Sequence, residues 1–168
     1  IHQYVAAGLD TTVSTIANAI QMLGENPDQY ATLRENPDMI VATINETLRM
    51  NALMVAQGRK TTKDVEVDGT LIPAGSHIAI LFGAGNRDPR HYEDPDVFKL
   101  ERNPFDHLSF GFGVHTCAGQ GLARMQITAV LEALIRNVKS YSIGTPVRKI
   151  NNSSLALEHL PVTNVVGA

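Results

Sequence analysis

The segment around the single cysteine constrains the fold of this chain more than any other feature of the sequence. Residues 110–119 read Phe-Gly-Phe-Gly-Val-His-Thr-Cys-Ala-Gly, with glycines at 111, 113 and 119. Glycine tolerates backbone conformations that other residues avoid, so this composition predicts a tight loop with close backbone approach. Apolar residues then recur at helical spacing, which predicts a long helix over about 119–138. Cys117 therefore stands on a constrained loop at the entrance to that helix.

The first part of the chain is predicted to be helical. Residues 1–23 are rich in Ala, Ile, Leu and Met and predict a mostly buried helix, interrupted by Gly8 and the β-branched residues that follow it. Two Asn-Pro pairs predict the starts of two further helices, over about 27–35 and 37–50, with asparagine as the capping residue.

The middle and the end of the chain predict small sheets joined by irregular segments. Residues 65–75 alternate and turn like a short hairpin, and residues 77–82 predict another strand. Residues 83–114 show almost no periodicity, and a long irregular stretch in a compact domain is usually functional. Residues 140–168 predict short strands and turns. The predicted fold class is mainly α with small β-sheets.

Composition and charge exclude several classes of function. The 14 basic and 17 acidic residues give a net charge of −3, and no basic run is longer than Arg59-Lys60, so we expect no nucleic-acid partner. No apolar stretch reaches the roughly 18 residues that a membrane helix needs. A single cysteine excludes an internal disulfide and a multi-cysteine zinc site, and we expect a cytoplasmic location.

Residue type and position leave three interpretations of Cys117 open. The first is a small buried apolar residue, which is the ordinary role of a lone cysteine. The second is a catalytic nucleophile with His115 as its base, although two residues on one loop give poor geometry and no orienting acid is evident. The third is a metal thiolate on a loop that wraps a flat cofactor, since a helix N-terminus favours the thiolate.

The pattern Phe-Gly-x-Gly-x-His-x-Cys-x-Gly resembles the haem-ligand loop of the cytochrome P450 family in its bacterial form. The resemblance favours the third interpretation. It implies haem b as cofactor, Cys117 as the metal ligand, and Phe110, Gly111 and Gly119 as loop residues that contact the haem. It also implies a cytochrome P450 fold and a monooxygenase that acts on a C–H bond of a small lipophilic substrate with O2.

A second motif lies on the third predicted helix. Glu46-Thr-Leu-Arg49 resembles the Glu-x-x-Arg motif of the family, and Arg102 would complete a buried structural triad with it. On residue spacing alone, Glu46 and Arg49 are an ordinary helical ion pair, which contributes a few tenths of a kcal/mol.

A third motif lies on the first predicted helix. Residues 7–12, Ala-Gly-Leu-Asp-Thr-Thr, resemble the oxygen-activation motif of the family. The resemblance implies that Asp10 and Thr11 are the catalytic acid and alcohol that relay protons, and that Ala7 and Gly8 contact the cofactor. Without it, the segment is a helix whose threonines bond to carbonyls of the preceding turn.

Several further positions match family sites for the haem edge and the substrate. Arg59 and His115 match donors to the haem propionates, with Gln57 as an assisting residue. For a lone apolar residue a place in the core is the more common role. The positions that match the substrate pocket are Ala6, Met54, Val55 and Leu155, with Ala156 beside the last. The other histidines show no metal-ligand spacing; they are at 2, 77, 91, 107 and 159.

The resemblance runs from residue 4 to residue 162, yet family members are more than twice as long. We therefore expect residues 1–168 to be the C-terminal haem-binding portion of one larger domain, with the N-terminal portion absent. A ferredoxin-type donor is expected to supply electrons, and Arg124, on the helix after Cys117, is the candidate contact with it. The alternatives are a truncated haem-binding chain without activity and, third, a cysteine enzyme without haem.

Overall fold

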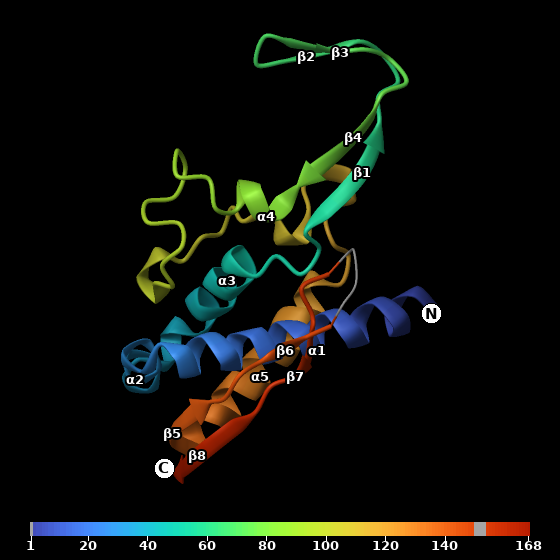
Figure 1. The fold of residues 1–168 in the computed structure, drawn as a ribbon. Helices are drawn as coiled ribbons and strands as arrows, with labels where there is room; N and C mark the ends of the chain where they lie inside the picture. The colour runs from blue at the N-terminus through green and yellow to red at the C-terminus, as the bar shows by residue number, and fades with distance from the viewer. Residues whose placement is uncertain (1, 150–153) are drawn as a thin grey trace.

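The computed structural model describes residues 2–149 and 154–168, with only the backbone given for residues 2–6. The longest helix, α1, crosses the molecule and lies against α3 and α5 (Figure 1). The helices of this layer are α1 (His2–Glu25), α2 (Pro27–Glu35), η1 (Pro37–Met39), α3 (Ile40–Met50) and α5 (Gln120–Asn137). Among the helices of the described residues, none combines the length and apolarity that crossing a membrane requires.

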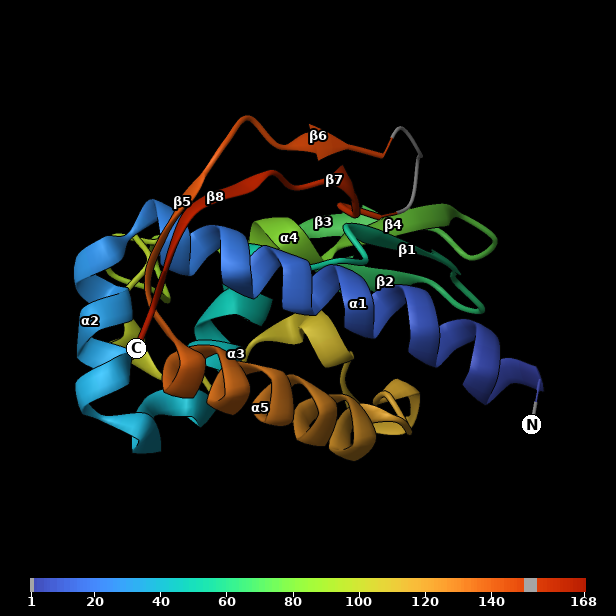
Figure 2. The ribbon, with the colours of Figure 1, turned by 90° about the horizontal axis from the view of Figure 1, so that it is seen from below.

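The core lies between α1, α3 and α5. Figure 2 shows α1 running lengthwise across the molecule with α5 beside it. Leu23, Ile44 and Leu131 come from these three helices and are fully buried together. Burial of one such side chain contributes about 1.5–3 kcal/mol. The helix predicted over 119–138 is therefore confirmed, and so are the two helices predicted over 27–50.

The predicted interruption of the first helix is wrong, because α1 runs unbroken from His2 to Glu25. The Thr11 hydroxyl donates a 2.6 Å hydrogen bond to the Ala7 carbonyl, and the Thr15 hydroxyl donates a 2.8 Å bond to the Thr11 carbonyl. A threonine can bond in this way to the carbonyl four residues before it without ending a helix.

The asparagines before α2 and η1 lie where they were predicted, but their side chains do not cap the helices that follow. The Asn26 amide donates to the Met22 carbonyl at 2.8 Å, and the Asn36 amide donates to the Thr32 carbonyl at 3.0 Å. Each asparagine side chain therefore bonds back to a carbonyl in the last turn of the preceding helix, and the Thr32 carbonyl also accepts the Asn36 backbone amide at 2.9 Å.

Short antiparallel ladders make up the β-structure of the described residues, as predicted for a mainly α chain. The pairs are β1 (Ala56–Lys60) with β4 (His77–Leu81), β2 (Val65–Val67) with β3 (Thr70–Ile72), β5 (Val138–Ile143) with β8 (Val162–Gly167), and β6 (Val147–Arg148) with β7 (Leu157–His159). The β2–β3 hairpin projects away from the helices (Figure 1). Asp68 and Gly69 at its tip both have positive φ, as a two-residue hairpin turn requires.

The irregular segment before α5 consists of loops and single helical turns, as predicted. The turns are α4 (Phe82–Gly85), η2 (Leu100–Arg102), η3 (Leu108–Phe110) and η4 (Gly113–His115). Such a segment lacks the repeating hydrogen bonds of a helix or sheet, so side chains must satisfy its backbone groups.

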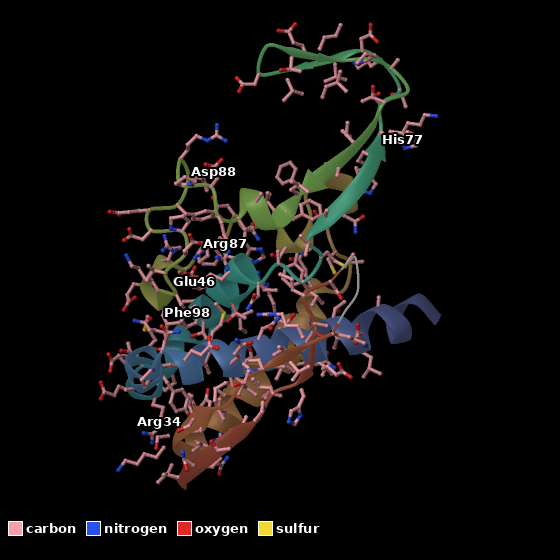
Figure 3. The ribbon with its side chains drawn as sticks, in the orientation of Figure 1. Arg34, Glu46, His77, Arg87, Asp88 and Phe98 are labelled. Atoms are coloured by element: carbon pink, nitrogen blue, oxygen red, sulfur yellow. The ribbon has the colours of Figure 1, made fainter. Side chains whose placement is uncertain are left out.

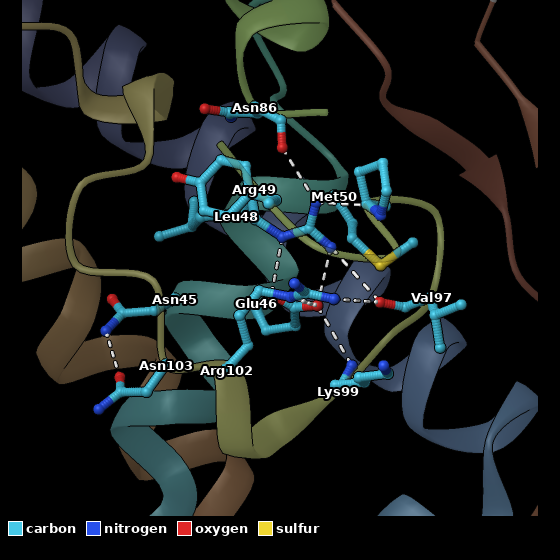
Figure 4. Close-up of polar contacts among 12 residues, drawn as sticks. Asn45, Glu46, Leu48, Arg49, Met50, Asn86, Val97, Lys99, Arg102 and Asn103 are labelled. Atoms are coloured by element: carbon cyan, nitrogen blue, oxygen red, sulfur yellow. Dashed lines mark hydrogen bonds and ion pairs between the residues drawn. The ribbon is translucent and has the colours of Figure 1, made fainter. Parts of the chain in front are cut away.

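Glu46 and Arg49 of α3 hold this segment from the interior. Both side chains are completely buried, and two nitrogens of Arg49 donate to the Glu46 carboxylate at 2.8 Å each (Figure 4). Arg49 also donates to the carbonyls of Asn86 and Pro95, at 2.9 and 2.7 Å. The Nε of Arg102 donates to the same carboxylate at 3.1 Å. The three predicted triad residues therefore lie together.

Arg102 extends this network into the loop before η2. Its guanidinium donates to the carbonyls of Glu93 and Asp94, and the Lys99 amide donates to the Glu46 carboxylate at 3.2 Å. Figure 3 shows Glu46 and Phe98 in the interior, whereas His77 lies out on the β1–β4 ladder. The carboxylate of Glu46 thus joins α3 to loops some fifty residues away in sequence.

We predict that Glu46→Gln lowers the free energy of unfolding by about 3–5 kcal/mol, because a buried guanidinium loses its charged partner. Urea denaturation followed by circular dichroism measures this change. The matched control is Asp94→Asn, which removes a solvent-exposed ion pair with Lys99 and is expected to change stability far less. Equal effects of the two substitutions would contradict the central role of Glu46.

Candidate functional site

A hollow of about 740 Å³ lies between α1, the β1–β4 ladder and the loop before α5. Most of the side chains that line it are apolar. The predicted site residues that line it are Thr11, Met54, Arg59, Phe110, Gly111, His115 and Cys117, together with Gln57. The fold therefore brings a threonine of α1, an arginine of β1 and the cysteine loop to one place.

The loop that carries Cys117 is closed by its own backbone. The Cys117 amide donates to the Phe110 carbonyl at 2.7 Å. Gly111 has a φ of +74°, and a Cβ added there would lie 2.9 Å from the His115 carbonyl oxygen, so a larger residue does not fit. Gly119 has an ordinary φ of −91° and room for a side chain, so the structure gives no steric reason for glycine there.

The thiol of Cys117 is exposed, which contradicts the interpretation of this residue as a buried apolar side chain. It lines the hollow three residues before the first residue of α5, Gln120. Within residues 7–149 and 154–168, no group of three or more His, Cys, Asp or Glu side chains could hold a metal ion together.

Two nitrogen donors accompany the thiol. Arg59 on β1 is half-buried and donates from Nη1 to the Gly58 carbonyl at 2.8 Å, which leaves its other nitrogens for a ligand. His115 on η4 is exposed. Both residues line the hollow with Cys117, so an acidic group bound there would meet a guanidinium and an imidazole.

The residues predicted on α1 separate into two groups. Thr11 lines the hollow, as do Thr12 and Thr15 of the same helix. Asp10 is exposed outside it, and one oxygen of its carboxylate lies 3.8 Å from the Lys149 ammonium nitrogen. Ala7 and Gly8 are exposed outside the lining as well. Neighbouring residues on a helix differ in direction by about 100°, so Asp10 and Thr11 face different ways.

The predicted substrate-pocket residues also separate. Met54 lines the hollow. Val55 and Leu155 lie outside the lining, where the Val55 carbonyl accepts from the Gly83 amide at 3.4 Å and the Leu155 amide donates to the Leu53 carbonyl at 3.0 Å. The side chain of Ala6 lies outside the described residues.

Most of the lining was missed from the sequence, because its apolar residues carry no signal that distinguishes them from core. Ala123 and Ile127 lie within the helix predicted over about 119–138, but they were not predicted to line a site. The missed residues are Thr12, Thr15, Leu48, Leu53, Ile80, Phe82, Leu108, Ser109, Phe112, Ala123 and Ile127.

His107 and Arg124 form a further polar group behind the cysteine loop. His107 is 6% exposed, and its Nε2 lies 3.4 Å from Nη2 of Arg124, while Nδ1 lies 3.3 Å from the Ser109 amide nitrogen. A neutral imidazole has one acceptor nitrogen, so it accepts only one of these two bonds at a time. Burial, and secondarily the charge of Arg124, lower the pKa of His107 to about 4.

The lowered pKa of His107 predicts an acid-sensitive fold. The folded chain resists protonation of this imidazole below its ordinary pKa of 6.5, whereas the unfolded chain accepts the proton. Its contribution to stability is therefore complete above pH 7 and is lost progressively as the pH falls from 6.5 toward 4. We expect about 2 kcal/mol of loss between pH 8 and pH 5 from this residue.

Urea denaturation at both pH values measures this loss in the parent chain and in His107→Gln, which keeps an acceptor but does not titrate. The difference between the two pH dependences isolates His107. Identical pH dependences would contradict the assigned burial of a neutral imidazole.

Comparisons with known proteins agree with this geometry. The profile of the family "Cytochrome P450" matches residues 1–163. Cytochrome p450 CYP199A2 of Rhodopseudomonas palustris is 39% identical over 163 residues, which cover 96% of this chain and 40% of the relative. Beta-dihydromenaquinone-9 omega-hydroxylase of Mycobacterium tuberculosis is 40% identical over 151 residues, which cover 90% of this chain and 31% of the relative.

Solved structures show the same similarity. Cytochrome P450 CYP150A6 of Mycobacterium marinum superposes with a TM-score of 0.91 at 34% identity, over 98% of this chain and 43% of that one. P450BioI in complex with an acyl carrier protein gives a TM-score of 0.90 at 37% identity, over 94% of this chain and 41% of that one. The chain thus spans about two fifths of the length of such relatives. On the profile match, these relatives and the shared fold, the chain belongs to the cytochrome P450 family.

Proposed function

We propose that this chain forms the haem-thiolate site of a monooxygenase. The enzyme inserts one oxygen atom of O2 into a C–H bond of a small lipophilic substrate, in a hydroxylation or a demethylation. The observation that carries the proposal is the exposed Cys117 thiol on a hydrogen-bonded loop in a largely apolar hollow. Because the chain spans about two fifths of its relatives, the activity is proposed for the protein as a whole.

Members of the family bind haem b, and the residues present here fit that cofactor. Cys117 offers one thiolate, Arg59 and His115 offer donors to two propionates, and apolar side chains line the space between. Gly111 lets the loop backbone bend where a Cβ would collide with the His115 carbonyl. When bound, the haem would supply oxygen activation, which a thiolate ligand promotes by donating electron density.

The residues of the chain would then hold the haem and orient it. Cys117 would hold the iron through Sγ, and the bond from its amide to the Phe110 carbonyl restricts the backbone that carries the thiolate. Arg59 and His115 would hold the propionates by charge-assisted hydrogen bonds and so help to orient the ring. Phe110 packs beside it.

Thr11 and Asp10 have separate tasks in this proposal. Thr11 lines the hollow, and its hydroxyl donates its proton from Oγ1 to the Ala7 carbonyl. Release of that bond directs the proton into the hollow. Asp10 is exposed outside the hollow, beside Lys149, and would take protons from solvent. To pass them to Thr11, its side chain would have to turn toward the hollow.

The class of substrate is proposed from the character of the lining and from the name of a relative. The hollow is lined mostly by apolar side chains, Met54 among them, and a relative from Streptomyces griseolus that is 38% identical is named a vitamin D3 dihydroxylase. A lipophilic substrate fits both observations. We further propose a ferredoxin-type donor, with Arg124 as a contact, and a cytoplasmic location.

The ligand assignment predicts the outcome of Cys117→Ser. The reduced, CO-treated parent protein should show the strongly red-shifted Soret band of a haem thiolate, because sulfur is the axial ligand. Cys117→Ser should lose that band, whereas the neighbouring control Thr116→Ser should keep it. An unchanged band in Cys117→Ser would contradict the assignment of Cys117 as the ligand of the iron.

The proton-relay proposal predicts uncoupling in Thr11→Ala. The variant should keep the thiolate spectrum, since Thr11 is no ligand, but release several-fold more peroxide per electron consumed, because a general acid typically contributes 10²–10⁴-fold to proton transfer. The control is Thr32→Ala, which removes the same kind of hydroxyl-to-carbonyl bond on α2. Unchanged peroxide release in Thr11→Ala, or an equal rise in peroxide release in Thr11→Ala and Thr32→Ala, would favour a chain that binds haem without using Thr11.

A further inference from the structure

Arg124 of α5 has its guanidinium turned toward the interior. Its Nη1 donates to the Asn45 amide oxygen at 2.6 Å, and the amide nitrogen of Asn45 donates to Asn103 at 2.9 Å. The guanidinium carbon lies 5.1 Å from the centre of the Phe110 ring. Arg124 thus joins α5 to α3, to the end of η2 and to the loop of Cys117.

Phe110 is held on two sides by this group. Its ring centre lies 5.6 Å from that of His107 and 5.1 Å from the Arg124 guanidinium, which is the arrangement of a cation–π contact. The carbonyl of the same residue accepts the Cys117 amide at 2.7 Å. Displacement of the ring would therefore move the backbone that fixes the cysteine.

The positive charge of Arg124 has no anionic partner among the described residues. Asn45, His107 and Phe110 are neutral, and no carboxylate of residues 7–149 or 154–168 forms an ion pair with it. Burial lowers the pKa of the guanidinium, as expected for a cation that is partly removed from water. A half-buried charge is screened less than an exposed one, so its field acts on groups nearby.

We propose that Arg124 is a positioning residue of the cysteine loop, and that its positive charge, which has no anionic partner among the described residues, raises the reduction potential of the iron that Cys117 would hold. The inference rests on the proposed haem-thiolate function. One-electron reduction adds negative charge to the site, so a nearby cation stabilises the reduced state, and net charge and burial are established determinants of haem potentials.

Spectroelectrochemical titration of the haem-loaded protein tests the effect of charge without any protein donor. Arg124→Gln should lower the potential, and Arg124→Lys, which keeps the charge, should shift it less than half as far. The matched control is Arg136→Gln, an exposed arginine of the same helix. It lies about 18 Å further along α5, beyond the screening length of roughly 8 Å, and should leave the potential unchanged.

Hydrogen–deuterium exchange of the peptide that spans 110–119 tests the positioning and needs no haem. Arg124→Gln and Arg124→Lys should both exchange the Cys117 amide faster, because neither side chain supplies the planar guanidinium. Arg136→Gln should match the parent. If the parent protein binds no haem and both Arg124 variants still exchange faster than it does, the proposed function is refuted and the positioning role stands.

Two results would overturn the inference. Equal potentials in the parent, Arg124→Gln and Arg136→Gln would exclude the charge effect, and unchanged exchange at Cys117 would exclude the positioning. If the potentials are equal, the exchange at Cys117 is unchanged and only the rate of reduction by a ferredoxin falls in Arg124→Gln, Arg124 serves as a docking contact alone.

Discussion

The buried carboxylate of Glu46 is the interaction on which the rest of the molecule depends. It accepts hydrogen bonds from Arg49, from Arg102 and from the backbone of Lys99. A carboxylate without access to water is stable only when such donors surround it, so its environment must form completely or not at all. That requirement fixes the loops between α4 and η2 against α3. The cysteine loop follows η2 in the chain, after residues 103–109.

The candidate site beside this network is formed by the backbone geometry of the cysteine loop rather than by a cluster of metal-ligating side chains. Gly111 permits the bend, the Cys117 amide closes it on Phe110, and the thiol then faces the hollow. Thr11 reaches the same hollow from α1. The cofactor would supply the redox chemistry, and the chain would supply one thiolate from Cys117 together with side chains that orient the ring and deliver protons.

The elements that could be predicted from the sequence are those with a local physical signal. The apolar stripe of α5, the prolines that begin α2 and η1, and the Asp-Gly turn of the β2–β3 hairpin each depend on nearby residues. Strand β1 was not predicted, since Ala56–Lys60 contains no β-branched or aromatic residue and pairs only because β4 lies beside it. The motifs identified Cys117 and Thr11, but not the partners of His107 and Arg124, which come from other elements. Asp10 was grouped with Thr11 by adjacency, although a helix turns them apart.

The proposed function depends on the sulfur of Cys117 serving as the protein ligand of a haem iron. X-ray absorption at the iron edge of the haem-loaded protein tests it most directly, because sulfur and the lighter porphyrin nitrogens scatter differently. The account predicts one sulfur in the first coordination shell, and its loss in the serine variant at position 117. A first shell of nitrogen and oxygen alone in the parent protein would contradict it.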